Sequence, residues 1–148
     1  MARSGALLLS VRPRFAHAIL EGTKTVELRR RRIAALPGTS VILYATTPTK
    51  AVVGTARIAS TVVCRPETAW RDHALCLGLE RHEFDGYLAG ATRACLLFLE
   101  DAQWLASPLP LAELRLTPSF RPPQSYRYVS GADPAGIRDL AGVGQRRA

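Results

Sequence analysis

The order of its apolar segments is the feature that most constrains the fold of this chain. Two strand-type segments, 41–45 and 52–63, follow one another through the polar loop 46–50 with no helix between them. Helix-type patterns occupy 13–22, 66–77 and 80–88, and the other strand-type segments are 6–11, 24–30, 94–100 and 126–129. Because strands and helices do not alternate as βαβ units, we predict an α+β fold, a small and mostly antiparallel β-barrel with helices packed outside.

The first helix and the strand after it have clear local signals. Pro13 suits the first turn of a helix, and the apolar stripe that follows stops at Gly22. In the segment 24–30, Val26 and Leu28 point to one side of a strand, which predicts a half-buried strand with a polar face. That polar face carries Thr25, Glu27 and Arg29.

The chain length of 148 residues suits one domain with a hydrophobic core. We predict this domain over 1–130. The composition turns to Gly, Ala and Arg after Ser130, so 131–148 is predicted to be a flexible C-terminal tail. No segment approaches the length of a membrane span, and we expect a cytoplasmic protein that neither crosses nor binds a membrane.

The three cysteines give no sign of a disulfide framework or a metal centre. They are odd in number and widely spaced, which indicates reduced and mainly buried thiols. A set of His73, Cys76 and His82 matches no usual ligand spacing. We therefore predict no metal and no cofactor.

Lysine is used twice in the chain, against eighteen arginines. One of the two, Lys24, lies in the segment 22–29 with the sequence GTKTVELR. An ammonium is a compact charge with an adjustable pKa, whereas a guanidinium is a rigid fork that stays protonated. The net charge of +8 is also uneven, because ten basic and two acidic residues occur up to Arg57 and ten of each follow it. This asymmetry favours a polyanionic partner, nucleic acid above all.

The motif Gly-x-Lys-x-x-Glu-x-Arg at 22–29, after a helix opened by the Ser-Val-Arg-Pro sequence 10–13, resembles the signature of ASCH domains. The likeness extends through 41–45, the Thr-Thr-Pro-x-Lys loop 46–50 and 53–54, and reaches 123–126. ASCH domains belong to the PUA-like superfamily of small β-barrels that bind RNA and modified nucleosides. The resemblance thus implies a PUA-like β-barrel for the predicted fold.

The resemblance also implies a cleft beside the first helix. Lys24 would offer its ammonium to a phosphate or a base carbonyl, and Glu27 would accept from an exocyclic amine or hold Lys24 in place. Arg29 would make a two-pronged phosphate contact. The complete set of predicted nucleic-acid contacts is Ser10, Arg12, Lys24, Glu27, Arg29, Arg30, Arg31, Tyr44, Thr46, Thr47 and Lys50.

Simpler interpretations of the same residues stay open at this point. Glu27 and Arg29 share one strand face, where a solvated ion pair contributes little free energy. The run Arg29–Arg32 also suits a basic edge that discourages strand association. Tyr44, in an apolar strand, suits the core as well as a stacking surface.

We predict a nucleic-acid-binding module, with RNA favoured over DNA as its partner. The alternative is an ASCH-type enzyme with Lys24 and Glu27 as catalytic groups, either a ribonuclease or an N4-acetylcytidine amidohydrolase. The amidohydrolases have a threonine three positions after the lysine, where this chain has Glu27, so the deacylation mechanism lacks its hydroxyl. A protein-interaction module is a third class, and it would show no salt-sensitive affinity for nucleic acid.

Overall fold

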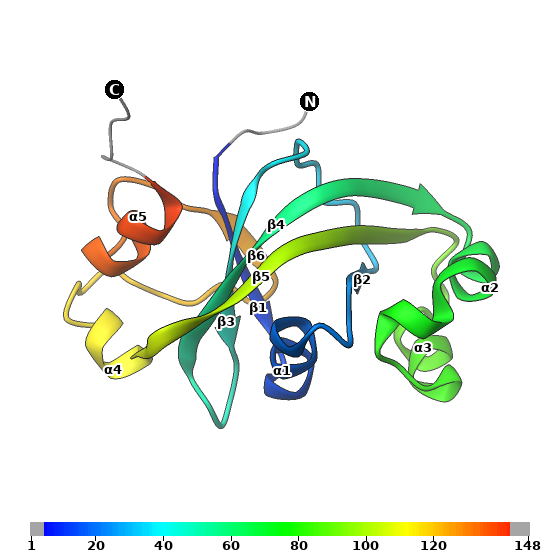
Figure 1. Cartoon of the computed structure of the whole chain (residues 1–148), viewed down its shortest axis with the longest axis horizontal. Coiled ribbons are helices and arrows are strands. Elements are labelled where there is room, and N and C mark those ends of the chain that lie inside the picture. The colour runs from blue at the N-terminus through cyan, green and yellow to red at the C-terminus, as the bar shows by residue number, and fades with distance from the viewer. Residues whose placement is uncertain (1–4, 143–148) are drawn as a thin grey trace.

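The structure, a computed structural model, describes residues 5–142 and has an α+β fold (Figure 1). Within that range a six-stranded sheet is combined with five helices. The elements are β1 (Leu7–Val11), α1 (Pro13–Glu21), β2 (Val26–Arg29), β3 (Ser40–Ala45), β4 (Ala51–Cys64), α2 (Pro66–Leu77), α3 (Arg81–Tyr87), β5 (Ala94–Pro110), α4 (Leu111–Leu114), β6 (Tyr126–Tyr128) and α5 (Ala135–Ala141). The predicted α+β class is confirmed. No described helix has the length and apolar character needed to span a membrane.

The sheet is mixed and curls into a half-barrel. Its strand order is β2-β5-β4-β3-β1-β6, in which β1 and β3 are parallel and the other neighbours are antiparallel. Within the described residues no backbone pairing joins β2 to β6, so the sheet has two edges and one open side. The prediction of a mostly antiparallel barrel therefore holds only roughly, because one strand pair is parallel and the curl is incomplete.

The long strands β4 and β5 form the arch of the half-barrel, and they run side by side in Figure 1. Their register shifts in three places, which bends both strands strongly. Gly54 lies at one of these shifts, and a Cβ there would come within 2.5 Å of the Leu20 side chain and 2.6 Å of the Gln103 carbonyl. A bulge with a close backbone approach, which an isolated glycine in a strand indicates, is what the structure has at Gly54.

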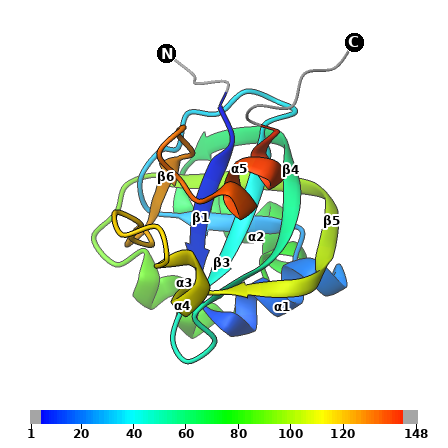
Figure 2. The same cartoon turned by 90° about the vertical axis from the view of Figure 1, so that its left-hand side faces the viewer.

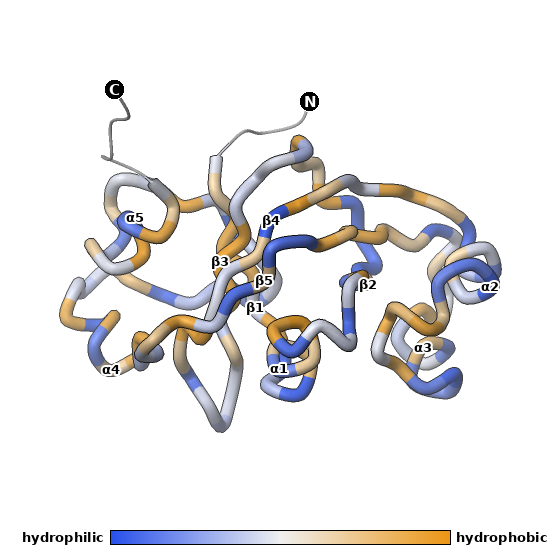
Figure 3. Tube along the Cα trace, in the orientation of Figure 1, coloured by the Kyte–Doolittle hydropathy of each residue, from blue (hydrophilic) through white to orange (hydrophobic). Residues whose placement is uncertain are grey.

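Hydrophobic clusters fill both faces of the sheet. α1 packs its apolar stripe on one face, and its hydrophobic turns point to the sheet in Figure 3. α4 and α5 cover the opposite face at one end of the molecule, which faces the viewer in Figure 2, while α2 and α3 pack on β2 at the other end (Figure 1). The first cluster is the one on which α1 packs, and the second cluster is the one that α4 and α5 cover. β1 is buried along its whole length because Leu7 and Leu9 pack in the first cluster and Leu8 packs in the second.

The last third of the chain is more structured than the sequence indicates. β5 continues to Pro110, beyond the expected end near Glu100, and α4 forms within the proline-rich connection. The segment expected as a flexible tail contains α5, whose Ile137 is fully buried against the second cluster. The remainder of that segment, 143–148, lies outside the described residues.

Candidate binding cleft at the open side of the sheet

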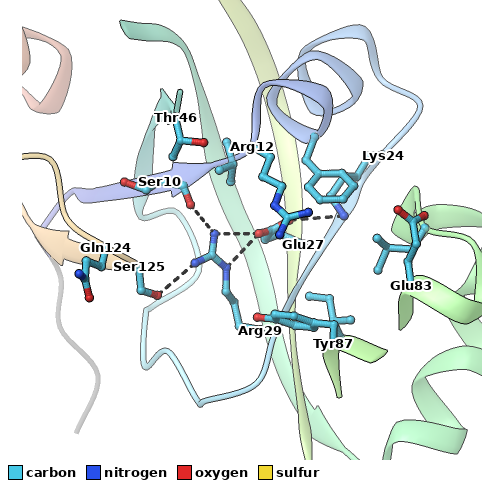
Figure 4. A pocket seen from close by; sticks show the side chains of 14 residues that line it. Ser10, Arg12, Lys24, Glu27, Arg29, Thr46, Glu83, Tyr87, Gln124 and Ser125 are labelled. Atoms are coloured by element: carbon cyan, nitrogen blue, oxygen red, sulfur yellow. Dashed lines mark hydrogen bonds and ion pairs between the residues drawn. The ribbon is translucent and has the colours of Figure 1, made fainter. Parts of the chain in front are cut away.

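A cleft of about 650 Å³ lies where the half-barrel is open. β1, α1 and β2 provide one part of its wall, the segment before β6 provides another, and α3 with the residues before it closes the end (Figure 4). Three charged groups from the GxKxxExR motif, Lys24, Glu27 and Arg29, line this cleft together. The motif therefore lies at the β2 edge of the sheet.

Lys24 is one of the most deeply buried side chains of the protein, with 2% of its surface exposed. Its Nζ donates a hydrogen bond to the carbonyl oxygen of Leu77, the last residue of α2. The carboxyl end of a helix carries partial negative charge, so this is a favourable place for an ammonium. The lysine methylenes lie against Gly78, where an added Cβ would approach them to 3.2 Å. Gly78 has a φ of +70° and ends α2, so the glycine serves both the turn and the contact.

Glu27 connects the two cations of the motif. Its Oε1 lies 3.4 Å from Lys24 Nζ, and its Oε2 accepts from Arg29 Nε at 2.9 Å. Glu27 and Arg29 are two residues apart on β2, so strand alternation places them on one face. The carboxylate is only 6% exposed, so this is a buried charge network and not the solvated ion pair that the sequence also allowed.

Arg29 joins the two sides of the open sheet. From β2 its guanidinium donates to the backbone carbonyl oxygen of Ser10 on β1 at 2.9 Å and to Ser125 Oγ at 3.1 Å (Figure 4). Most of its N–H donors are therefore used within the protein. The two-pronged phosphate contact expected of Arg29 would require these bonds to break.

The pKa of Lys24 lies below the ordinary value for lysine. Burial is the largest cause, because removing the ammonium from water disfavours its charged form. The Glu27 carboxylate opposes this shift, and the guanidinium groups of Arg29 and Arg14 add to it. Lys24 is thus a lysine whose proton is released more easily than that of an exposed one.

Arg12 differs from the other cleft cations because its guanidinium has no partner among the residues that the structure describes. It is exposed, it lines the cleft and it points inward beside Glu27 in Figure 4. Within residues 5–142 no hydrogen bond or ion pair engages it, whereas Lys24 and Arg29 are both paired. A ligand anion that enters the cleft finds this cation available.

The structure divides the eleven predicted contact residues into two groups. Six of them line the cleft: Ser10, Arg12, Lys24, Glu27, Arg29 and Thr46. The Ser10 hydroxyl donates to the Pro123 carbonyl oxygen at 2.6 Å, so it fixes the neighbouring segment.

The other five predicted residues do not line the cleft: Arg30, Arg31, Tyr44, Thr47 and Lys50. Tyr44 is buried in the second hydrophobic cluster, where burial raises the pKa of its hydroxyl. Arg30 donates to the carbonyl oxygens of Tyr87 and Ala89 and so holds the end of α3 against β2. Arg31, Thr47 and Lys50 are exposed.

Several cleft residues were missing from the sequence prediction. They are Val11, Phe15, Leu28, Leu79, Glu83, Tyr87, Gln124 and Ser125. Gln124 and Ser125 lie in the stretch 123–126 to which the family likeness extends, so that signal was present. No local pattern singles out Tyr87 or Glu83, because their place depends on how α3 packs against β2. Within the described residues no three His, Cys, Asp or Glu side chains gather as a metal site.

Comparison with known proteins gives the family of this fold and cleft. The ASCH domain pattern matches residues 9–99, and this chain belongs to the ASCH domain family. The predicted family is therefore confirmed. A curated relative, the ASCH domain-containing ribonuclease of Zymomonas mobilis, is 32% identical over 123 residues, which cover 82% of each chain.

Solved structures agree with this assignment. A crystal structure of a mutant ASCH protein from Zymomonas mobilis superposes with a TM-score of 0.85 at 29% identity, covering 93% of this chain and 99% of that one. A crystal structure of a Pseudomonas putida protein has a TM-score of 0.58 at 19% identity, covering 92% of this chain and 99% of that one. The second likeness concerns the fold alone.

Proposed function

We propose that this protein binds single-stranded RNA, with one nucleotide seated in the cleft and its phosphate on Arg12. The observation that carries the proposal is the Arg12 guanidinium, which has no partner in the described part of the chain, in a cleft whose motif charges are paired with one another. The volume of about 650 Å³ is in the usual range for small-ligand sites. A guanidinium is well suited to a phosphate because it presents parallel N–H donors.

The motif residues would form a preorganised polar surface that contacts the base. Lys24, Glu27 and Arg29 hold one another, so their geometry is set before a ligand arrives. Oε1 of Glu27, which lies 3.4 Å from Lys24 Nζ, retains acceptor capacity, and this suits an exocyclic amine of a base. The rings of Phe15 and Tyr87 line the same cleft and offer surfaces on which a base can stack.

The charge of the chain favours a nucleic acid as partner, and the name of a relative favours RNA over DNA. The excess of basic residues in the first part of the chain suits a polyanion. The relative that matches 82% of this chain is named a ribonuclease. Single-stranded RNA, with unpaired bases, is the form from which one nucleotide enters a cleft most easily.

RNA cleavage is the second candidate, favoured by the relative's name and by the lowered pKa of Lys24. In cleavage by 2′-hydroxyl attack, Glu27 would take the hydroxyl proton and Lys24 would protonate the departing 5′-oxygen. Arg12 would stabilise the charge on the phosphorane, because Arg29 is occupied by Ser10, Ser125 and Glu27.

A salt series with single-stranded RNA, tRNA and duplex DNA tests binding. The affinity should fall steeply with salt, and Arg12→Ala should reduce the log–log slope by about 0.7, the value for one phosphate contact to a single strand. Arg115→Ala removes an exposed arginine at the end of α4, outside the cleft, and should leave the slope nearly unchanged. Absence of affinity for every nucleic acid at low salt would refute the proposal. Product analysis with wild type and Lys24→Ala decides cleavage, because cleavage that survives the change excludes Lys24 from the mechanism.

A further inference from the structure

An ion pair joins α1 to α3 beside the cleft. Arg14 on α1 approaches Glu83 on α3, with 2.6 Å between the guanidinium nitrogen Nη2 and Oε2. The arginine side chain is 61% exposed and the glutamate 25%. Glu83 lines the cleft, and Arg14 lies two residues from Arg12 at the start of α1. The pair thus places an exposed cation and a carboxylate next to each other at the end of the cleft that α3 closes.

Glu83 is held in position by a second contact. Its Oε1 accepts the backbone N–H of Glu80 at 2.9 Å in a capping box at the start of α3. Arg14 also lies over the Phe15 ring, 4.5 Å from its centroid. Both partners are therefore oriented by contacts other than the ion pair, and the carboxylate faces Arg14 without further ordering.

We infer that Arg14 is a second phosphate-contacting residue, adjacent to Arg12, and that Glu83 competes with the RNA backbone for it. The inference rests on the proposed RNA binding. An exposed ion pair contributes little free energy, so a phosphate can replace the carboxylate. Glu83 would then lower the affinity for RNA in the resting protein by occupying Arg14 and by adding negative charge to the cleft wall.

Variants of α3 separate competition from simple electrostatics. Glu83→Gln keeps an oxygen acceptor for the capping box but removes the charge that holds Arg14. It should raise the RNA affinity about two- to fivefold, the range set by the strength of an exposed ion pair. Asp85→Asn removes one charge from the same helix, but Asp85 pairs with Arg81 at 3.0 Å and not with Arg14. The gain from Asp85→Asn should be distinctly smaller.

The experiment measures fluorescence anisotropy of a labelled 2′-O-methylated octauridylate, which cannot be cut through its 2′-hydroxyl, over a salt series. Arg14→Ala should weaken binding about three- to tenfold and lower the salt slope by about 0.7. In the Arg14→Ala background, Glu83→Gln should bring no more gain than Asp85→Asn.

Four outcomes overturn the inference. Equal gains in RNA affinity from Glu83→Gln and Asp85→Asn would mean that only the overall charge matters. A full gain in RNA affinity from Glu83→Gln in the Arg14→Ala background would mean that Glu83 does not compete with RNA for Arg14. If wild type binds and Arg12→Ala weakens it while Arg14→Ala does not, the proposed function stands and the role of Arg14 falls. If no variant binds the probe, both fall together.

Discussion

Two buried carboxylates of this protein, Glu27 and Asp133, differ in what surrounds them. Both are 6% exposed, and both accept short hydrogen bonds from an arginine. Asp133 accepts from Arg127 at 2.9 and 2.7 Å and from the backbone N–H of Ser130 at 2.9 Å. Arg138 on α5 donates to the backbone carbonyl oxygen of Asp133, so Asp133 connects the segment after β6 to α5.

Glu27 holds two cations instead of one, and it faces a cleft. One of those cations is a buried lysine with a lowered pKa, and a free arginine points toward the same space. The Asp133 cluster connects chain segments, whereas the Glu27 cluster also leaves acceptor capacity beside an unpaired cation. A buried ion pair thus indicates a binding site when unpaired groups lie beside it in a cleft. It indicates a structural role when every group of the cluster is paired within the protein.

Removing the charge of Glu27 or of Asp133 should give the largest difference between the binding role of the first cluster of charges and the structural role of the second. Glu27→Gln leaves Lys24 and Arg29 buried without a counter-charge, and should lower the free energy of unfolding by about 3 kcal/mol and abolish RNA binding. Asp133→Asn should lower it by about 2 kcal/mol, because Arg127 is partly exposed, and should leave the affinity for RNA unchanged. Urea unfolding and RNA anisotropy measure both effects. A loss of RNA affinity in Asp133→Asn would remove the distinction.

The glycine under Lys24 gives the next largest effect. Gly78→Ala places a Cβ against the lysine methylenes at a φ of +70°, and should destabilise the protein by about 2 kcal/mol. Gly22→Ala has a φ of +88° but open space around its Cβ, so about 1 kcal/mol from backbone strain should remain. Thermal unfolding measures both. Equal losses would mean that the close packing of Lys24 on Gly78 contributes nothing.

The acid response should belong to the Asp133 cluster. Burial raises the pKa of Asp133, but the hydrogen bonds from Arg127 and Ser130 outweigh it and hold the pKa below its ordinary value. A lowered folded-state pKa adds stability above the unfolded pKa of about 3.9, and this stability is lost as the pH falls through the folded pKa. The stability difference between wild type and Asp133→Asn should therefore shrink below about pH 4. A difference that stays constant down to acid unfolding would contradict this assignment.

The alkaline response should belong to the Glu27 cluster, and here too the stability should rise with pH, because the pKa of Lys24 is also lowered in the folded state. The pKa of Lys24 is lowered in the folded state, chiefly by burial, so the unfolded chain binds more protons between the folded and unfolded pKa values. The stability of wild type relative to Lys24→Met should therefore rise as the pH approaches the unfolded value of about 10.4. Comparing the two proteins at each pH cancels the contributions of the cysteines and tyrosines. A stability difference that does not change with pH would show that burial does not disfavour the charged form of Lys24.

Much of this architecture is predictable from the sequence. Short motifs with local causes predicted α1 between Pro13 and Gly22 and the β2 face that Glu27 and Arg29 share, and the family likeness implied one cleft for Lys24 and Glu27. The prediction that the strand is half-buried was wrong, because Glu27 is buried as well as Val26 and Leu28. The use of Arg29 was not predictable, because its acceptors on Ser10 and Ser125 become neighbours only when the sheet curls.

The remaining differences have the same origin. Tyr44 and Lys50 were grouped with the cleft because they lie within segments of the family likeness, but Tyr44 packs in the core and Lys50 is exposed outside the cleft. α5 escaped prediction because its stretch is rich in Gly and Ala, and its burial depends on Ile137 meeting the far face of the sheet. Long-range packing decides such cases, and local patterns do not report it.

A crystal structure with uridine 5′-monophosphate tests the central claim most directly. The account predicts the phosphate within hydrogen-bonding distance of the Arg12 guanidinium, with the base beside the rings of Phe15 and Tyr87 and facing Glu27. A nucleotide bound instead at the exposed loop of Thr47 and Lys50, with the cleft empty, would contradict the account.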